Sequence, residues 1–412
     1  MLSQLTKNNY KKTGIIFLIL ISKLFSQNLQ HHYDFQLNSS LSKQWWSNNN
    51  NFGQKPSNIK LNYNGLYQKN GTDYTISLSA LEEEFYIGES FIKSKLYKNT
   101  YIKFGRYYKD FSAYLNDDLS SGSMLISNNA QPMPKIGILS SYELQRNINI
   151  NFTFGIAHAL FNKNNIYTNA PMLHEKFLYL NYIEDNNKFS AGFVHEAMWG
   201  GSTKNGSFPE SFKDFLKVFI SADGPQLEGE PHANALGNHL GIWDFSYEKK
   251  TGNKALKIYY QHFFEDTSGL RFDNKSDGLW GIELSNFIKN TDILFEYLNT
   301  MNQNNDPPYL NDNYYNHYQY QGGWSYEGYA LGNPFINYLN NNPLKVFHLG
   351  ISSNDSNMYS YKLLASRKIH MTDYIKYHIS VGKIVDQYLI RIIMNGNENM
   401  DHEIGFGISR QL

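Results

Sequence analysis

Alternation of apolar and polar residues over short stretches constrains the fold of this chain more than any other feature. Over residues 374–381, Ile375, Tyr377, Ile379 and Val381 alternate with the more polar Tyr374, Lys376, His378 and Ser380. The same period of two recurs at 73–80, 243–248, 256–265 and 404–412. Successive side chains of a strand point to opposite faces, so each stretch predicts a β-strand with one apolar and one polar face.

The length and composition of these stretches favour a transmembrane barrel over a soluble secreted sandwich, whose strands also alternate. The stretches run for about 9–11 residues, which is the length of a transmembrane strand. The apolar faces often carry Tyr or Trp near one end, as aromatic girdles do, and 16% of the residues are aromatic. The other faces carry charges and amides, which suit a wet lumen. We count roughly sixteen to eighteen stretches and expect an all-β fold, a single antiparallel transmembrane barrel of about 18 strands.

The N-terminus predicts export from the cytoplasm. Lys7, Lys11 and Lys12 precede a short apolar core at 15–21, and Ser26 is small enough for a cleavage site. The core is shorter than the roughly 20 residues that span a bilayer, although a short N-terminal anchor is the alternative. We therefore expect a signal peptide at 1–26 and a barrel at 27–412. The absence of cysteine excludes disulfides, thiolate metal sites and a lipid-anchored N-terminus.

The charge balance excludes several classes of protein. Lys and Arg total 37, as do Asp and Glu, so the chain is formally neutral. This balance disfavours a basic nucleic-acid binder and an acidic disordered chain. A mean hydropathy of −0.52 disfavours a polytopic helical membrane protein.

Three segments are too long to be turns, namely 108–135, 197–238 and 301–344. The second carries apolar residues at helical spacing and predicts one short helix, with Ser207 as its N-cap and Pro209 in its first turn. Short signals such as Asn70-Gly71 and Thr251-Gly252-Asn253 predict tight turns, which we expect on the periplasmic side. Long loops on one rim are where such barrels carry function.

The long loops combine the side chains that bind sugars: aromatic faces for the C–H surface of a pyranose, and carboxylates, amides and Arg for its hydroxyls. The candidate polysaccharide-binding residues are Trp199, Asn238, His239, Asp266, Arg271, Trp280, Tyr309, Tyr314 and Trp324. Each could instead pack loop against loop or belong to an interfacial girdle.

Other clusters give weak signals for catalysis or metal binding. Glu82-Glu83-Glu84 could supply a carboxylate pair for glycoside cleavage, but an acidic rim is the simpler interpretation. His174-Glu175 and His195-Glu196 do not form His-Glu-x-x-His, and adjacent strand residues point to opposite sides of a wall. We therefore expect no catalytic residue, no metal site and no cofactor.

Several segments, in order along the chain, resemble the Wzi-like capsule assembly proteins of the Gram-negative outer membrane. They are Gly122-Ser123 with 127–135, His174–Tyr179, Trp199-Gly200-Gly201, Asn238–Asp244, Glu265-Asp266 with Asp277–Gly281, Gly332-Asn333-Pro334 and Pro343-Leu344. The resemblance implies an eighteen-stranded outer-membrane barrel, monomeric in lipid, with its loops at the cell surface. It further implies a lectin that binds capsular polysaccharide or exopolysaccharide and does not cleave it. A diffusion porin, a membrane-embedded carbohydrate hydrolase and a purely structural barrel remain the alternatives.

Overall fold

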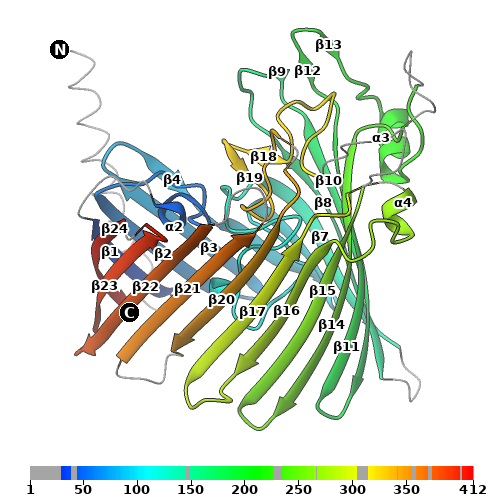
Figure 1. Cartoon of the computed structure of the whole chain (residues 1–412). Helices are drawn as coiled ribbons and strands as arrows, with labels where there is room; N and C mark the ends of the chain where they lie inside the picture. The colour runs from blue at the N-terminus through cyan, green and yellow to red at the C-terminus, as the bar shows by residue number, and fades with distance from the viewer. Residues whose placement is uncertain are drawn as a thin grey trace, which may run out of the picture.

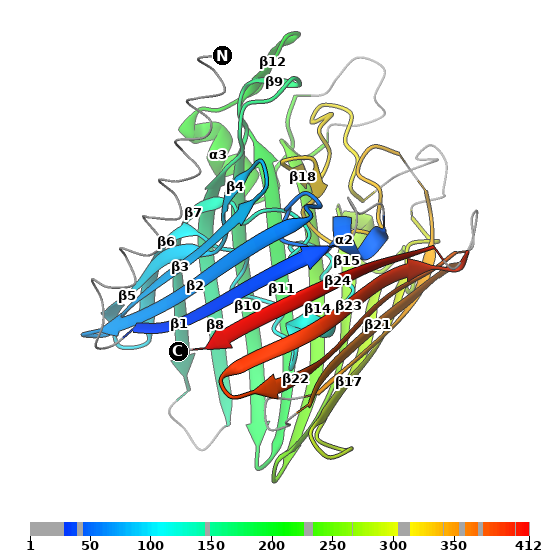
Figure 2. The same cartoon turned by 90° about the vertical axis from the view of Figure 1, so that its left-hand side faces the viewer.

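The computed structural model describes residues 29–38, 44–144, 149–225, 234–265, 267–303, 314–340, 342–353, 359–369, 374–399 and 401–411. The predicted signal peptide at 1–26 lies outside these ranges. Within them the chain folds into a closed antiparallel β-barrel (Figures 1 and 2). This confirms the predicted fold class.

Eighteen strands form the wall, and each pairs with the strand before and after it. They are β1 (Leu29–Asn38), β2 (Ile59–Lys69), β3 (Thr72–Leu81), β5 (Ser90–Tyr97), β6 (Thr100–Arg106), β7 (Pro134–Glu143), β8 (Ile150–Leu160), β10 (Met172–Glu184), β11 (Asn187–Trp199), β14 (Asn238–Thr251), β15 (Lys254–Phe264), β16 (Gly278–Ser285), β17 (Thr291–Asn299), β20 (Lys345–Ser353), β21 (Tyr359–Ile369), β22 (Tyr374–Val385), β23 (Tyr388–Asn397) and β24 (His402–Gln411). The short β4 (Phe85–Ile87) adds to one end of β3. The barrel closes where β1 pairs with β24, with His32 opposite Gln411 and Asn38 opposite Gly405.

The period-two pattern places apolar side chains on the outside of the wall. On β22, Val381 is 55% exposed on the outer face, whereas its neighbour Ser380 is buried in the lumen. Ile392 on β23 and Ile404 on β24 are likewise exposed on the outside. Among the described residues, no helix is long and apolar enough to cross a membrane.

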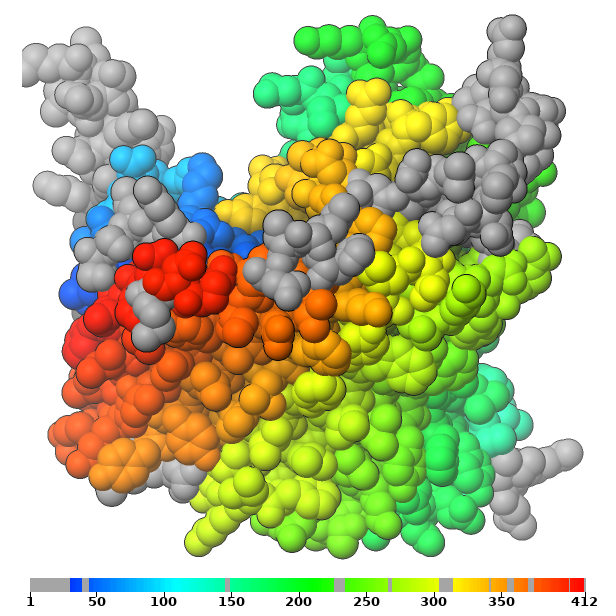
Figure 3. Space-filling model, in the orientation of Figure 1, coloured from blue at the N-terminus to red at the C-terminus, as the bar shows by residue number. Residues whose placement is uncertain are grey.

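The two rims of the barrel differ in their connections. One rim carries tight turns and both ends of the described chain, because β1 starts and β24 ends there. At its β2–β3 turn, Asn70 and Gly71 have φ values of 52° and 74°, as a type I′ hairpin requires. The opposite rim carries the long connections, and these rise higher over β8–β15 than over β20–β24 (Figures 1 and 3). We call this second edge the long-loop rim.

The connections that leave the wall at the long-loop rim contain the smaller elements. They are α2 (Trp45–Asn48), η1 (Asp117–Leu119), β9 (Tyr167–Asn169), β12 (Ser202–Thr203), β13 (Gly206–Ser207), α3 (Phe212–Phe219), α4 (Thr267–Leu270), β18 (Ser325–Tyr326) and β19 (Tyr329–Ala330). The predicted N-cap of the helix was wrong, because Ser207 lies in β13 and the cap is Ser211. Ser211 accepts a hydrogen bond from the backbone N–H of Asp214, whose carboxylate accepts one from the Ser211 N–H. This reciprocal capping box fixes the start of α3.

Candidate functional site

The connection between β6 and β7, residues 107–133, folds into the barrel, and we call it the plug segment. Met124, Leu125 and Ile126 are buried at its centre. Carboxylates of the wall accept hydrogen bonds from it: Leu115 N donates to Glu283 (2.7 Å), Ser121 N to Glu296 (2.6 Å) and Ser112 Oγ to Asp244 (2.6 Å). Because the wall presents acceptors to the lumen, a Ser- and Asn-rich segment can be buried there without leaving its N–H groups unpaired.

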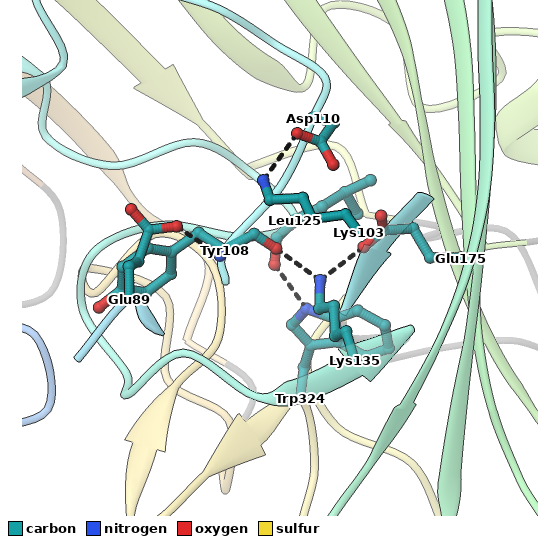
Figure 4. Close-up of polar contacts among 8 residues, drawn as sticks. All are labelled: Glu89, Lys103, Tyr108, Asp110, Leu125, Lys135, Glu175 and Trp324. Atoms are coloured by element: carbon teal, nitrogen blue, oxygen red, sulfur yellow. Dashed lines mark hydrogen bonds and ion pairs between the residues drawn. The ribbon is translucent and has the colours of Figure 1, made fainter. Parts of the chain in front are cut away.

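Two ion pairs lie at the base of the plug segment (Figure 4). Lys135 Nζ lies 2.7 Å from Glu175 Oε2, with side chains only 1% and 2% exposed, and Lys135 also donates to the Tyr108 carbonyl. Lys103 lies 2.9 Å from Asp110. Lys135 (β7) and Glu175 (β10) both belong to the wall, so the links from the wall to the plug segment are the Lys135–Tyr108 hydrogen bond and the Lys103–Asp110 pair. Removing one partner of such a buried pair would leave an uncompensated charge.

Residues 314–340, between β17 and β20, pack over the plug segment, and we call them the cover segment. Trp324 is fully buried and its indole Nε1 donates to the Leu125 carbonyl at 2.8 Å (Figure 4). The Asn333 amide donates to the Gly122 carbonyl at 2.6 Å, and Ser127 N donates to the Leu331 carbonyl at 2.8 Å. The cover segment therefore closes the lumen over the plug segment at the long-loop rim.

A cavity of about 770 Å³ remains in the lumen beside the plug segment. Strands β1, β2, β17 and β20–β24 form its wall, and the plug segment borders it on the other side. Residues 46–57 around α2 lie at the long-loop end. Eighteen of its lining side chains are Ser, Asn or Gln. Five carboxylates and five Lys or Arg side chains balance one another: Asp34, Asp117, Asp118, Asp292, Glu403, and Lys55, Lys60, Lys109, Lys362, Arg391.

Hydrogen bonds hold the lining of the cavity in place. Arg391 forms an ion pair with Asp34. Ser47 on α2 donates to Glu403 and accepts from the Asn395 amide, both at 2.7 Å. These contacts fix α2 to strands β23 and β24. The cavity thus presents positioned donors and acceptors of both kinds, which is what hydroxyl-rich ligands need.

Five of the residues predicted to bind saccharide are buried in loop and wall packing. Trp199 packs against Phe215 of α3, and Trp324 holds the plug segment. His239 lies 2.9 Å from a ring nitrogen of His195, and Asn238 donates to the sulfur of Met198. Tyr314 stacks on Phe263 and donates to Asp277 at 2.8 Å. The structure does not bring these five residues to one surface.

The remaining predicted residues lie elsewhere. Trp280 is 40% exposed on the outside of the wall and stacks on Tyr260 with ring centroids 3.7 Å apart. Arg271 is exposed beside Asp273 at the long-loop rim. Asp266 and Tyr309 lie outside the described residues. Contact of any of the nine with saccharide stays a prediction.

The cavity residues escaped the sequence analysis, which searched the long loops for aromatic side chains. The cavity residues on the strands, such as Asn62, Ser380 and Arg391, are polar residues at alternate positions. Every strand of a barrel carries such lumen-facing residues, so the pattern does not show which of them line a cavity. Among the described residues, no group of three or more His, Asp or Glu side chains could hold a metal ion.

Comparisons with known proteins find solved structures of low sequence identity. Among solved structures, OpdL of Pseudomonas aeruginosa matches with 10% identity and a TM-score of 0.45, over 93% of this chain and 98% of that one. OccK11 (OpdR) of the same species matches with 9% identity and a TM-score of 0.42, over 93% of this chain and 95% of that one. A Rhodopseudomonas blastica porin triple mutant matches with 8% identity and a TM-score of 0.40, over 93% of this chain and 99% of that one. No curated protein matches.

The family model described as "Capsule assembly protein Wzi" matches residues 24–341, which is most of the chain. It covers the plug segment, the cover segment and every strand from β1 to β17. The chain therefore belongs to the Wzi capsule assembly family and is a capsule-related outer-membrane β-barrel.

Proposed function

We propose that this protein binds capsular polysaccharide or exopolysaccharide at the cell surface and helps to attach it there, as a monomer in the outer membrane and without cleaving the glycan. The lumenal cavity is the observation that carries the proposal. Its volume of about 770 Å³ lies within the roughly 300–1,000 Å³ of typical ligand sites, and it suits a short segment of a glycan chain.

The chemistry of the lining favours an uncharged or weakly charged glycan. Neutral Ser, Asn and Gln side chains dominate, and the balanced charges give no single sign of field. Trp46, Tyr114 and Tyr361 add aromatic surface to the lining. In this proposal the buried Trp199, Tyr314 and Trp324 act by holding the loops, and the long-loop rim faces the cell exterior.

The facing carboxylates Glu175 and Glu196 are poorly placed for hydrolysis. Glu175 and Glu196 face each other across β10 and β11, but both are buried beneath the plug segment and Lys135 pairs with Glu175. A glycosidase needs two carboxylates on either side of a bond that substrate can reach. These two are shielded from a polymer.

A bulky side chain in the cavity tests the proposal. Ser380→Trp places an indole in the cavity, whereas Val381→Trp places the same indole on the outer face one residue along β22. Both proteins would be refolded in detergent and titrated calorimetrically with polysaccharide purified from the same cells. We expect saturable binding by the unaltered protein and by Val381→Trp, and much weaker binding by Ser380→Trp.

Two outcomes would count against this proposal. Equal binding by both variants would move the site away from the cavity. No binding by a correctly folded barrel would refute the lectin hypothesis altogether. Single-channel conductance would then decide whether the protein is a porin, which must pass ions through the space that the plug and cover segments occupy.

A further inference from the structure

Helix α3 lies against the outside of the barrel wall at the long-loop end (Figure 1). On β10, Leu173 and Glu175 are buried in the lumen, while Leu178 and Leu180 are exposed on the outer face. His174 and Lys176 share the phase of Leu178 and Leu180, so they point outward. The contacts of α3 are with this outward set.

Aromatic and ionic contacts hold α3 on the wall. The Phe215 ring lies 5.4 Å from that of His174 and 5.3 Å from that of Trp199, and Phe219 lies 5.2 Å from His174. Lys176 donates to the Phe219 carbonyl at the C-terminal end of the helix, where the helix dipole favours a cation. Neither ring nitrogen of His174 has a hydrogen-bond partner among the described residues, so this side chain packs as an apolar ring.

A second face of α3, adjacent to the packed one, is also apolar, and it is exposed. Phe212, Leu216 and Ile220 recur every four residues, so they form one stripe along the helix. They are 76%, 48% and 70% exposed. The apolar arc of α3 is therefore wider than its contact with the wall, which is expected where the rest of the arc also leaves water.

The position of the stripe identifies what covers it. The stretch of β10 from His174 to Glu184 rises about 25 Å along the barrel axis, at about 3.3 Å per residue and a tilt of about 40°. The apolar band of an outer-membrane barrel is also about 25 Å tall. The stripe therefore lies at the upper edge of the band, directly continuing the lipid-facing Leu178 and Leu180. Lys213 and Lys217 flank it, as in helices that lie in a membrane interface.

We infer that α3 is an interfacial membrane helix, and that the Phe212–Leu216–Ile220 stripe inserts among the lipid acyl chains of the leaflet on the long-loop side. Naming this the outer leaflet rests on the orientation in the proposed function, but the insertion does not. The helix would widen the lipid-contacting surface of the wall at β10 and β11. It would also anchor the long connection from β11 to β14 at the depth of the lipid head groups.

The absence of cysteine permits a direct test of this inference. Single substitutions Phe212→Cys, Leu216→Cys and Lys213→Cys would each carry a nitroxide spin label, in protein reconstituted into vesicles of phosphatidylethanolamine and phosphatidylglycerol. Collisions with oxygen, which concentrates in lipid, would be compared with collisions with a water-soluble nickel complex. Ile392→Cys on the outer face of β23 is the lipid reference, and Lys204→Cys on the exposed β12–β13 hairpin is the water reference.

We expect labels at Phe212 and Leu216 to resemble the label at Ile392, and the label at Lys213 to shift toward the Lys204 value. Water-like labels at both stripe positions would overturn the inference. So would spin–spin broadening at Leu216, because it would mean that a second copy of the chain covers the stripe. All substituted positions are exposed, so the variants should fold, and heat-dependent gel migration checks this. Failure of the cavity test would leave these outcomes unchanged.

Discussion

Loss of Lys135 should make the plug segment open more often, because the plug segment covers the Lys135–Glu175 pair of the wall and Lys135 donates to its Tyr108 carbonyl. Lys135→Met removes the cation and leaves Glu175 buried beside Glu196 with no compensating charge. Breaking a buried pair by removing one partner costs about 3–5 kcal/mol. Opening of the plug segment should therefore become about a hundredfold to a few thousandfold more frequent, since each 1.4 kcal/mol is a factor of ten.

A thiol in the plug segment measures this opening. Ser121 is buried outside the lining of the cavity, and Ser121→Cys changes only its Oγ atom, which accepts a hydrogen bond from the Asn333 amide at 3.2 Å. A maleimide reagent can reach this thiol only when the plug segment opens, so the labelling rate reports the free energy of opening. We expect Lys135→Met to accelerate labelling by the factor above and to raise single-channel conductance.

Two control variants sharpen this experiment. Lys55→Met breaks the exposed pair with Glu84 and should change the labelling rate by less than about fivefold. Adding Glu175→Leu to Lys135→Met removes the orphaned charge and should return much of the lost stability. If Lys135→Met labels at the original rate, neither the hydrogen bond from Lys135 to Tyr108 nor the compensation of the Glu175 charge keeps the plug segment closed.

Two further predictions concern the segments above the plug. Burial raises the pKa of Asp277 to about 6, above the ordinary 3.8, so its protonated form is favoured in the folded loop. Protonated Asp277 should contribute on the order of 3 kcal/mol to the free energy of unfolding near pH 4, and this contribution should be lost as the pH rises through about 6. Thermal unfolding of Asp277→Asn should not show this dependence on pH. At Gly332, an added Cβ would lie 2.1 Å from Tyr315 Oη and 2.3 Å from the Met124 carbonyl oxygen. Gly332→Ala should therefore displace the cover segment at a cost of about 1–3 kcal/mol and accelerate Ser121→Cys labelling. An unchanged rate would show that this contact does not hold the cover segment in place.

The wall of the barrel was predictable because its physics is local. Successive residues of a strand face lipid and lumen in turn. Apolar side chains such as Val381 and Ile392 therefore indicate the outer face wherever they recur with period two. The tight turn at Asn70-Gly71 was predictable for the same reason, since positive φ values are readily adopted by these residue types.

The burial of the long connections inside the barrel was not predictable from local sequence. Ser- and Asn-rich connections ordinarily run over the surface, but the plug segment is buried because wall carboxylates from distant strands accept its hydrogen bonds. Aromatic residues in the loops suggested sugar contacts. Trp324 instead packs one loop against another, because its indole N–H donates to the Leu125 carbonyl, 199 residues away in sequence.

The cavity shows most clearly why the candidate site could not be assembled from motifs. Asp34 and Arg391 are 357 residues apart, and only the closure of β24 onto β1 brings their neighbourhoods together. The family match ends at residue 341, yet Lys362, Arg391 and Glu403 come from strands beyond it. The matched region supplies the plug segment, whereas strands from both ends of the chain supply the wall of the cavity. If glycan binds in the cavity, the polar faces of β20–β24 contribute to its selectivity as much as the long loops do.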